Sequence, residues 1–273
     1  MLITENKKSA MSIIQAILLA FIEGITEFLP ISSTGHMVLM SSFLGIEKDK
    51  FTKLFEICIQ LGAILAVVVL YWKKFFNFSN WQFYVKLFIA VIPALIFGKL
   101  FNDLIDEHLE NPAFIATVLL VGGVILLFVD GWFKNPIIHE EVDINNISAI
   151  KIGLFQCLAI LFPGLSRSAA TIIGGMQQRL TRSLAAEFSF FLAVPTMAAA
   201  TGYKLLKFIK EEGSLSGEEV KLLGIGNVVA FIVAILAIKF FISILSKYGF
   251  KYFGIYRIVL GVTILVMLAI GKY

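Results

Sequence analysis

Apolar positions dominate this chain in long runs that are separated by short polar connectors. A helix needs about 20 apolar residues to cross the roughly 30 Å hydrocarbon layer of a membrane. Six stretches reach that length, over residues 54–72, 82–101, 113–133, 184–206, 222–245 and 253–271. The pattern therefore predicts an all-α polytopic membrane protein with six transmembrane helices.

Two further apolar regions, residues 12–45 and 149–178, are interrupted near their middles by proline, glycine and several polar side chains. Backbone that leaves a helix exposes its N–H and C=O groups, which lipid does not satisfy. Such backbone must be wrapped by protein or line a wet cavity. Each region is therefore predicted to be a re-entrant hairpin of two half-helices rather than a span.

The two halves of the chain resemble each other when the sequence is shifted by 133 residues, which places Ser33 opposite Ser166. The repeats, about 12–133 and about 149–271, each contain one hairpin followed by three spans. Because three is odd, consecutive repeats enter the membrane from opposite faces. The sequence predicts a single membrane domain with inverted topology and a polar site near the midplane, where the hairpins meet.

The composition agrees with lipid as the solvent, since 59% of the residues are hydrophobic and 15% are charged. Soluble proteins average about 45–50% apolar and about 25% charged residues. A net charge of +4 provides no strong positive field, so no nucleic-acid partner is expected. Cys58 and Cys157 lie in apolar segments and are interpreted as packing residues. Basic residues divide almost evenly between the two sets of connectors, so charge bias predicts no orientation.

The first candidate site segment is EGITEFLPISSTGH, which begins at Glu23. Glu23 and Glu27 are four residues apart, so they share one face of a helix. Two carboxylates on a membrane-buried face are costly unless a cation or a basic side chain lies between them. A solvated surface helix is the alternative, but apolar residues flank the pair on both sides.

Three consecutive hydroxyl residues, Ser32, Ser33 and Thr34, follow the break and mark the start of a second half-helix. Helix N-termini bind anions through their free N–H groups. His36 lies three residues past Ser33 and is expected to reach that hydroxyl, as a base that activates it or as an acid that protonates a leaving oxygen. Capping explains one hydroxyl, and a lone histidine is more often a core residue. The combination of three hydroxyl residues and a histidine favours a catalytic role.

The second candidate site segment is FPGLSRSAAT, in which proline and glycine again break an apolar run. Arg167 lies between Ser166 and Ser168, with Thr171 one turn later. Its planar guanidinium matches phosphate oxygens. The alternative is a structural ion pair with a membrane carboxylate such as Glu187.

The two segments together predict a site for a metal-bound phosphoryl group. The arginine suits an anion, whereas Glu23 and Glu27 suit Mg²⁺ or Ca²⁺, hard cations that take oxygen ligands. The predicted cofactor is therefore a divalent cation held by these two carboxylates.

At these residues the sequence resembles the undecaprenyl-diphosphate phosphatase family, polytopic bacterial membrane enzymes linked to bacitracin resistance. The motifs EGITEFLPISSTGH and PGLSRSAAT carry the resemblance, and FEICIQLGAILAVV and EFSFFLAVP extend it over nearly the whole chain. It implies hydrolysis of undecaprenyl diphosphate to undecaprenyl phosphate and inorganic phosphate, which recycles the lipid carrier of cell-wall peptidoglycan synthesis. It also implies a divalent cation, the bacterial cytoplasmic membrane and a site that faces the outer side.

The resemblance also implies roles for residues. The catalytic residues it implies are Glu23, Glu27, Ser33, His36 and Arg167. The supporting, substrate-binding hydroxyls are Ser32, Thr34, Ser166, Ser168 and Thr171. In one mechanism Ser33 attacks the terminal phosphorus, with His36 accepting or relaying its proton; in the other, water attacks and Ser33 is a phosphate donor.

Two other function classes compete with the phosphatase. Inverted repeats with broken helices are typical of secondary transporters, so a transporter or flippase of a phosphate-bearing polyprenyl lipid is the main alternative. Transport needs neither a nucleophile nor a proton relay, however. A structural scaffold would leave the clustered charges unexplained. The sequence leaves the oligomeric state open, and a homodimer is compatible with it.

Overall fold

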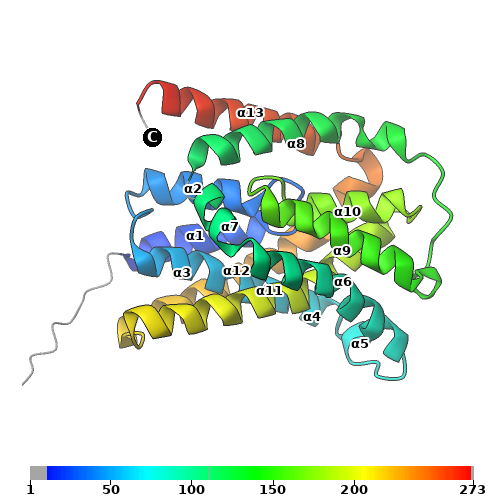
Figure 1. Cartoon of the computed structure of the whole chain (residues 1–273), viewed down its shortest axis with the longest axis horizontal. Helices are drawn as coiled ribbons and strands as arrows, with labels where there is room; N and C mark the ends of the chain where they lie inside the picture. The colour runs from blue at the N-terminus through cyan, green and yellow to red at the C-terminus, as the bar shows by residue number, and fades with distance from the viewer. Residues whose placement is uncertain (1–10, 110, 272–273) are drawn as a thin grey trace, which may run out of the picture.

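The computed structural model of the chain describes residues 11–109 and 111–271, and these residues are almost entirely helical (Figure 1). The elements in chain order are α1 (Ile13–Thr26), α2 (Ser33–Phe43), α3 (Lys50–Cys58), α4 (Gln60–Leu70), α5 (Trp72–Phe75), α6 (Trp81–Leu100), α7 (Asn102–Leu109), α8 (Pro112–Trp132), the 3-10 turn η1 (Glu141–Asp143), α9 (Asn146–Leu161), α10 (Arg167–Gln177), α11 (Arg182–Glu212), α12 (Gly217–Tyr248) and α13 (Lys251–Ala269). Strand-like pairing within the described part is limited to a bridge between Ile138 and Leu180.

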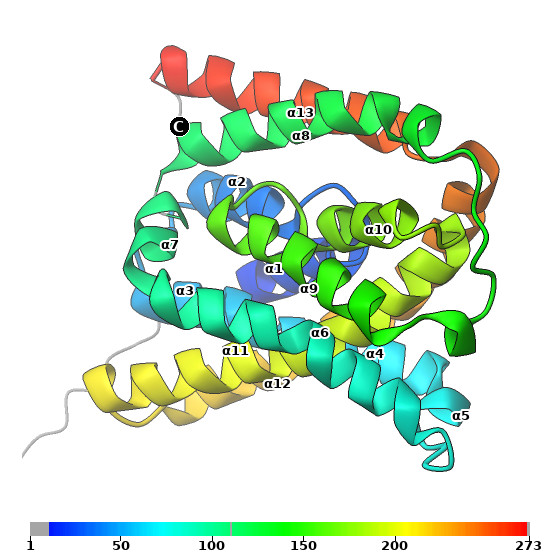
Figure 2. The same ribbon diagram turned by 45° about the vertical axis from the view of Figure 1, so that its right-hand side comes forward.

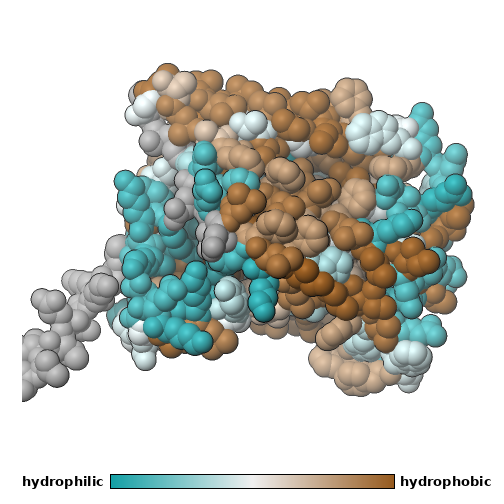
Figure 3. Space-filling view, in the orientation of Figure 1, coloured by the Kyte–Doolittle hydropathy of each residue, from teal (hydrophilic) through white to brown (hydrophobic). Residues whose placement is uncertain are grey.

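Six apolar helices are long enough to cross a membrane, and each lies where a span was predicted. They are Lys50–Leu70, which comprises α3 and α4, Trp81–Leu100, Pro112–Trp132, Arg182–Glu212, Gly217–Tyr248 and Lys251–Ala269. Hydrophobic surface covers most of the middle of the face in Figure 3, and hydrophilic surface gathers at its left and right ends, where the connectors lie. The polytopic all-α fold is confirmed.

Capping residues explain where several of these helices begin. The Asn111 side chain accepts a hydrogen bond from Phe114 N at the start of α8, and Pro112 occupies the first helical position. Ser216 and Glu219 form a capping box at the start of α12. These side chains satisfy backbone N–H groups that have no partner inside the helix.

The two interrupted regions form two helical hairpins, α1–α2 and α9–α10. Both views show that they open at opposite ends of the bundle, the first at the end where α3 begins and the second at the end where α11 begins (Figures 1 and 2). Their closed tips, residues 27–32 and 162–166, lie between these ends. This arrangement supports the inverted repeat; the two-fold relation and the re-entrant placement in a bilayer stay predictions.

Helix packing is reciprocal between the two halves: α1 packs along α12, α9 packs along α6, and α8 packs along α13. Glycines allow the close approaches. A Cβ built on Gly62 would lie 2.2 Å from Asn227 O of α12, and one built on Gly153 would lie 2.2 Å from Ala90 O of α6. Small residues at such crossings let helix backbones come into direct contact, which is how helices associate in lipid.

The structure adds detail that the hydropathy pattern did not predict. The connector before residue 110 contains the short helix α7, which is too polar and too short to register as a span. The tips also align differently, because Ser32 rather than Ser33 occupies the position equivalent to Ser166. The local offset is 134 rather than 133, since the second loop has one more residue between its proline and its helix.

The connector between the halves is tied to the bundle by a buried lysine. Lys86 of α6 donates from Nζ to Glu141 O at 3.0 Å and to Val142 O at 3.1 Å. An ammonium group that is buried in this way needs backbone acceptors. The contact holds η1 against α6 just before α9 begins.

Candidate active site

The tips of the two hairpins are in direct contact. Arg167 Nη2, at the start of α10, lies 3.1 Å from Glu27 Oε1, which follows α1. Ser168 Oγ donates to Leu29 O at 2.8 Å. Residues that are about 140 positions apart in the sequence therefore build one polar site inside an apolar bundle.

Both half-helices begin with a serine in an unusual backbone conformation. Ser32 has φ 69° and Ser166 has φ 77°, and their side chains accept hydrogen bonds from Gly35 N and Ala169 N, each at 3.3 Å. Positive φ is costly for a residue other than glycine and persists only where the surrounding structure enforces it. Two such caps on facing tips mark a functional site.

Glu27 joins the predicted nucleophile to the predicted phosphate-binding arginine. Ser33 Oγ donates to Glu27 Oε2 at 2.5 Å, while Glu27 Oε1 accepts from Arg167. Ser33 and Glu27 are both buried, at 9% and 7% exposure. A carboxylate this close to a serine hydroxyl is placed to accept its proton.

His36 does not contact Ser33, contrary to the expectation from their spacing. Its Nδ1 lies 2.7 Å from Ser32 O, and its Nε2 lies 2.7 Å from the hydroxyl of Tyr256 on α13. The bond to the carbonyl one turn earlier directs the ring toward α13 rather than toward the serine. Tyr256 is 220 residues away in the sequence, so only the fold reveals this partner.

The site leaves one buried carboxylate and one buried donor without a hydrogen-bond partner. Glu23 is 0% exposed, and its carboxylate oxygens have no partner among the described residues other than the neighbouring carboxyl group of Glu27. Arg167 Nε has no partner among these residues. Buried polar groups are nearly always satisfied, so these atoms point to a missing ligand. The charges that act on Glu23 are those of Glu27, Glu56 and Arg167, and Glu56 is a neighbour that the sequence analysis did not place in the site.

The carboxylates of the site fit a divalent cation only in part. Among the side chains that the structure describes, three or more histidine, cysteine or acidic groups never converge to hold a metal ion. Glu23 has both oxygens available, whereas the oxygens of Glu27 are bonded to Ser33 and Arg167. Magnesium commonly takes one or two carboxylates and completes its shell with water and substrate phosphate oxygens. Glu23 fits such a role, and Glu27 fits it only by sharing an oxygen.

The remaining predicted hydroxyls mainly position Arg167 and its helix. Thr171 Oγ1 donates to Arg167 O at 2.8 Å and lies 2.6 Å from Ser189 Oγ. Ser189 of α11 also accepts from Arg167 Nη1 at 3.1 Å through its carbonyl oxygen, a role the sequence did not predict. Ser166 Oγ lies 3.0 Å from Ser168 Oγ.

Two further expectations are resolved by the same contacts. Glu187 pairs with Lys74 at 2.8 Å, so it is not the partner of Arg167. Thr34 is half-buried beside Ser33 in the first turn of α2, next to the site.

Arg257 is the main residue that sequence reasoning missed. It is 0% exposed and donates to Leu119 O at 3.2 Å, Pro30 O at 3.3 Å, Leu165 O at 2.7 Å and Gly164 O at 2.9 Å. One guanidinium thus satisfies carbonyl groups from both hairpin tips and from α8. The available signal was a lone arginine inside a predicted span, where charge is rarely accidental.

The space for Arg257 depends on a glycine of α8. A Cβ built on Gly122 would lie 2.2 Å from Arg257 Nη2. A larger residue at this position would displace the guanidinium from the tips.

Comparison with known proteins gives the family. Residues 16–263 match the protein family described as "Bacitracin resistance protein BacA". The chain belongs to this family. The matched segment contains both hairpin tips and Arg257, so the residues of the site lie within it.

Several relatives in the family are similar over almost their full length. An undecaprenyl-diphosphatase of Flavobacterium johnsoniae is 59% identical over 258 residues, 94% of this chain and 96% of that protein. One of Porphyromonas gingivalis is 50% identical, covering 96% of this chain and 98% of that protein. One of Lacticaseibacillus paracasei is 42% identical, covering 94% and 99%.

Replacing Arg257 by methionine should destabilise the fold, because it removes the charge and leaves carbonyls of both tips unsatisfied. We expect a loss of at least about 3 kcal/mol, since each buried group left without a partner costs about 1–3 kcal/mol. The measurement is the thermal unfolding midpoint in detergent, with Lys251→Met as control, because Lys251 is exposed at the start of the same helix. Equal midpoints for the two variants would contradict the role of Arg257.

Proposed function

We propose that the chain is an undecaprenyl-diphosphate phosphatase, which releases inorganic phosphate and regenerates undecaprenyl phosphate for cell-wall synthesis. The observation that carries the proposal is the pair of buried groups left without a complementary partner, Glu23 and Arg167 Nε, together with the Ser33–Glu27 hydrogen bond. A diphosphate would supply the acceptor that Arg167 lacks. The names of the relatives support the same substrate.

The terminal phosphate would be bound by Arg167 and by the two facing helix starts. Arg167 already holds Glu27 with one nitrogen and Ser189 O with another, so its orientation is set before substrate arrives. The first N–H groups of α2 and α10 have no partner inside their helices and attract anions. Donors that are fixed in advance lower the cost of binding and of charge development in the transition state.

In the proposed mechanism Ser33 attacks the terminal phosphorus. The Oγ–P bond forms as the bond between that phosphorus and the bridging oxygen breaks, and undecaprenyl phosphate leaves with the electron pair. The proton of Ser33 passes to Glu27, which already accepts it in a hydrogen bond. Water then attacks the phosphoryl-serine, Glu27 returns a proton, and phosphate leaves.

His36 has a different position in this scheme from the one expected. It is bonded to Ser32 O and to Tyr256, at the side of the site that faces α13. We infer that His36 exchanges protons with the leaving oxygen or with the attacking water rather than with Ser33. Direct attack by water, with Ser33 only binding phosphate, remains the alternative mechanism.

We also propose that catalysis uses a divalent cation, Mg²⁺ or Ca²⁺. The support is the chemistry of Glu23, a buried carboxylate with two unbonded oxygens, and the nearby charge of Glu27 and Glu56. When bound, the ion would neutralise phosphate charge as the phosphoryl group is transferred. Glu23 would be its main protein ligand and Glu27 a shared one.

The remaining expectations concern the surroundings of the enzyme. We propose that the polyprenyl tail lies along apolar surface between the spans, where each buried CH₂ is worth about 0.8 kcal/mol. We further propose the bacterial cytoplasmic membrane, with the site open to the outer side, because the relatives are bacterial and the carrier is needed there. A homodimer stays a prediction.

Purified protein in detergent should release one phosphate from each undecaprenyl diphosphate and leave undecaprenyl monophosphate, which mass spectrometry identifies. Arg167→Lys should lower kcat/KM by at least about a hundredfold, because the ammonium group of lysine cannot replace the planar set of N–H donors of the guanidinium group. Lys210→Arg, at an exposed position near the end of α11, serves as a control. Unchanged diphosphate that only moves between the leaflets of a vesicle would favour a transporter instead.

Ser33→Ala distinguishes the two mechanisms. If Ser33 is the nucleophile, kcat should fall by about a thousandfold or more and no phosphoryl-enzyme should form in the variant. Ser42→Ala on the same helix is the matched control and should keep normal turnover. Substantial turnover by folded Ser33→Ala protein would assign the attack to water.

Glu23→Gln tests the cation. The metal concentration that gives half-maximal activity should rise by at least about tenfold, and calorimetry should show weaker Mg²⁺ or Ca²⁺ binding. Glu218→Gln removes an exposed carboxylate at the start of α12 and should leave both values unchanged. Full activity after exhaustive chelation would show that no divalent cation is needed.

A further inference from the structure

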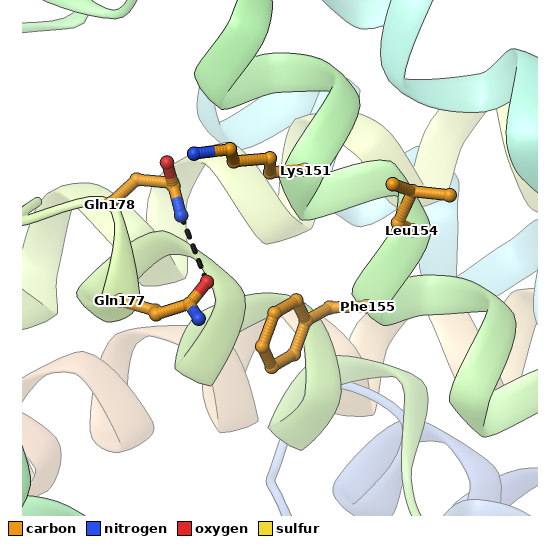
Figure 4. A pocket seen from close by; sticks show the side chains of 5 residues that line it. All are labelled: Lys151, Leu154, Phe155, Gln177 and Gln178. Atoms are coloured by element: carbon orange, nitrogen blue, oxygen red, sulfur yellow. Dashed lines mark hydrogen bonds between the residues drawn. The ribbon is translucent and has the colours of Figure 1, made fainter.

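The open end of the second hairpin contains two cavities that share Gln177, the last residue of α10. One cavity, of about 410 Å³, is lined by Lys151, Leu154, Phe155, Gln177 and Gln178. Figure 4 shows the Lys151 side chain extending from α9 toward Gln178, with the Phe155 ring facing Gln177. These residues lie at the base of the hairpin, whereas the catalytic side chains lie at its tip.

The second cavity, of about 310 Å³, is also lined by Gln177. Its lining includes Trp132, Lys134 and Arg179. The Arg179 backbone has φ 65°, and its carbonyl accepts from Ile137 N at 2.9 Å and from Ile138 N at 3.0 Å. These two hydrogen bonds attach the connector after α8 to Arg179.

The charged side chains that line the two cavities are all basic. Lys151 lines the first, Lys134 and Arg179 line the second, and no aspartate or glutamate is among the described residues that line either. Basic pockets between membrane helices, at headgroup level, bind anionic lipid headgroups. Charge complementarity therefore favours an anionic occupant.

Amide groups and an apolar wall complete the first cavity. Gln178 Nε2 donates to Gln177 Oε1 at 2.9 Å, which fixes the two amides relative to each other (Figure 4). The Phe155 ring is held against Gly174, where a Cβ would lie 2.8 Å from the ring. One edge of the cavity is therefore cationic and carries amide groups, which suits a phosphate headgroup. The aromatic wall beside it suits the hydrocarbon chain joined to that headgroup.

An exposed apolar stripe on α9 passes the cavity. Ile147, Ile150, Leu154 and Leu158 are 64%, 41%, 48% and 43% exposed, and their spacing places them on one face of the helix. Trp132 at the rim of the second cavity is 58% exposed, as is typical of the aromatic belt at the membrane interface. Acyl chains would follow the stripe while the phosphate stays at the rim.

We propose that this end of the hairpin is a binding site for an anionic phospholipid of the surrounding bilayer. Lys151, Lys134 and Arg179 bind the headgroup phosphate, Gln177 and Gln178 donate to its oxygens, and one acyl chain lies against Leu154 on α9. The site is separate from the catalytic tips. It anchors the base of the hairpin whose tip carries Arg167.

Native mass spectrometry of the full-length protein tests the site, with phosphatidylglycerol and phosphatidylcholine of the same acyl chains as probes. The wild-type protein should retain phosphatidylglycerol preferentially. The triple variant Lys134→Gln, Lys151→Gln and Arg179→Gln should reduce this preference by at least about tenfold, because each basic residue near the surface contributes substantially to anionic lipid binding. Phosphate release from a detergent-solubilised substrate shows that the variant is folded.

The matched control removes three basic residues from the same end of the bundle but outside the cavities: Lys73→Gln, Lys247→Gln and Lys251→Gln. It should keep the wild-type preference. The proposal is overturned if the wild type does not prefer phosphatidylglycerol, or if the control loses the preference as fully as the triple variant. It is also overturned if millimolar inorganic phosphate alone displaces the lipid, because the site would then bind free phosphate.

Discussion

Arg257 holds the two hairpin tips together by donating to their carbonyl oxygens. Broken helices inside an apolar bundle expose backbone groups that lipid does not satisfy. A single buried guanidinium bonds to Pro30 O, Gly164 O and Leu165 O, as well as to Leu119 O. With the tips joined in this way, the two half-helix starts face each other, and the rest of the site depends on that arrangement.

The contact between the two tips holds a carboxylate, a hydroxyl and a guanidinium group at fixed positions. Glu27 accepts from both Ser33 and Arg167, so it connects the proposed nucleophile to the proposed phosphate-binding group. Glu23 and Arg167 Nε stay unsatisfied within the described residues. Unsatisfied buried groups lower stability, and here they coincide with positive φ at Ser32 and Ser166. The loss of stability is therefore concentrated at the site where a bound substrate and cation would offset it.

Much of the fold could be predicted because lipid imposes a simple rule on sequence. A span must be apolar over most of its length, so six helices were located with their ends within six residues of those observed. Breaks in apolar runs located both hairpins for the same reason. The helix α7 and the one-residue shift between Ser32 and Ser166 were missed, because short polar helices and loop lengths leave no periodic apolar signal.

By itself, the sequence determined that the chain is a membrane protein, where its spans lie and which residues are candidates for the site, because burial cost makes each charge inside an apolar run informative. Only the tertiary structure decided which of these residues meet. It paired Ser33 with Glu27, turned His36 toward Tyr256 and brought Arg257 to both tips. These contacts depend on helix packing between residues far apart in the chain, and hydropathy, which is a local property, contains no information about them.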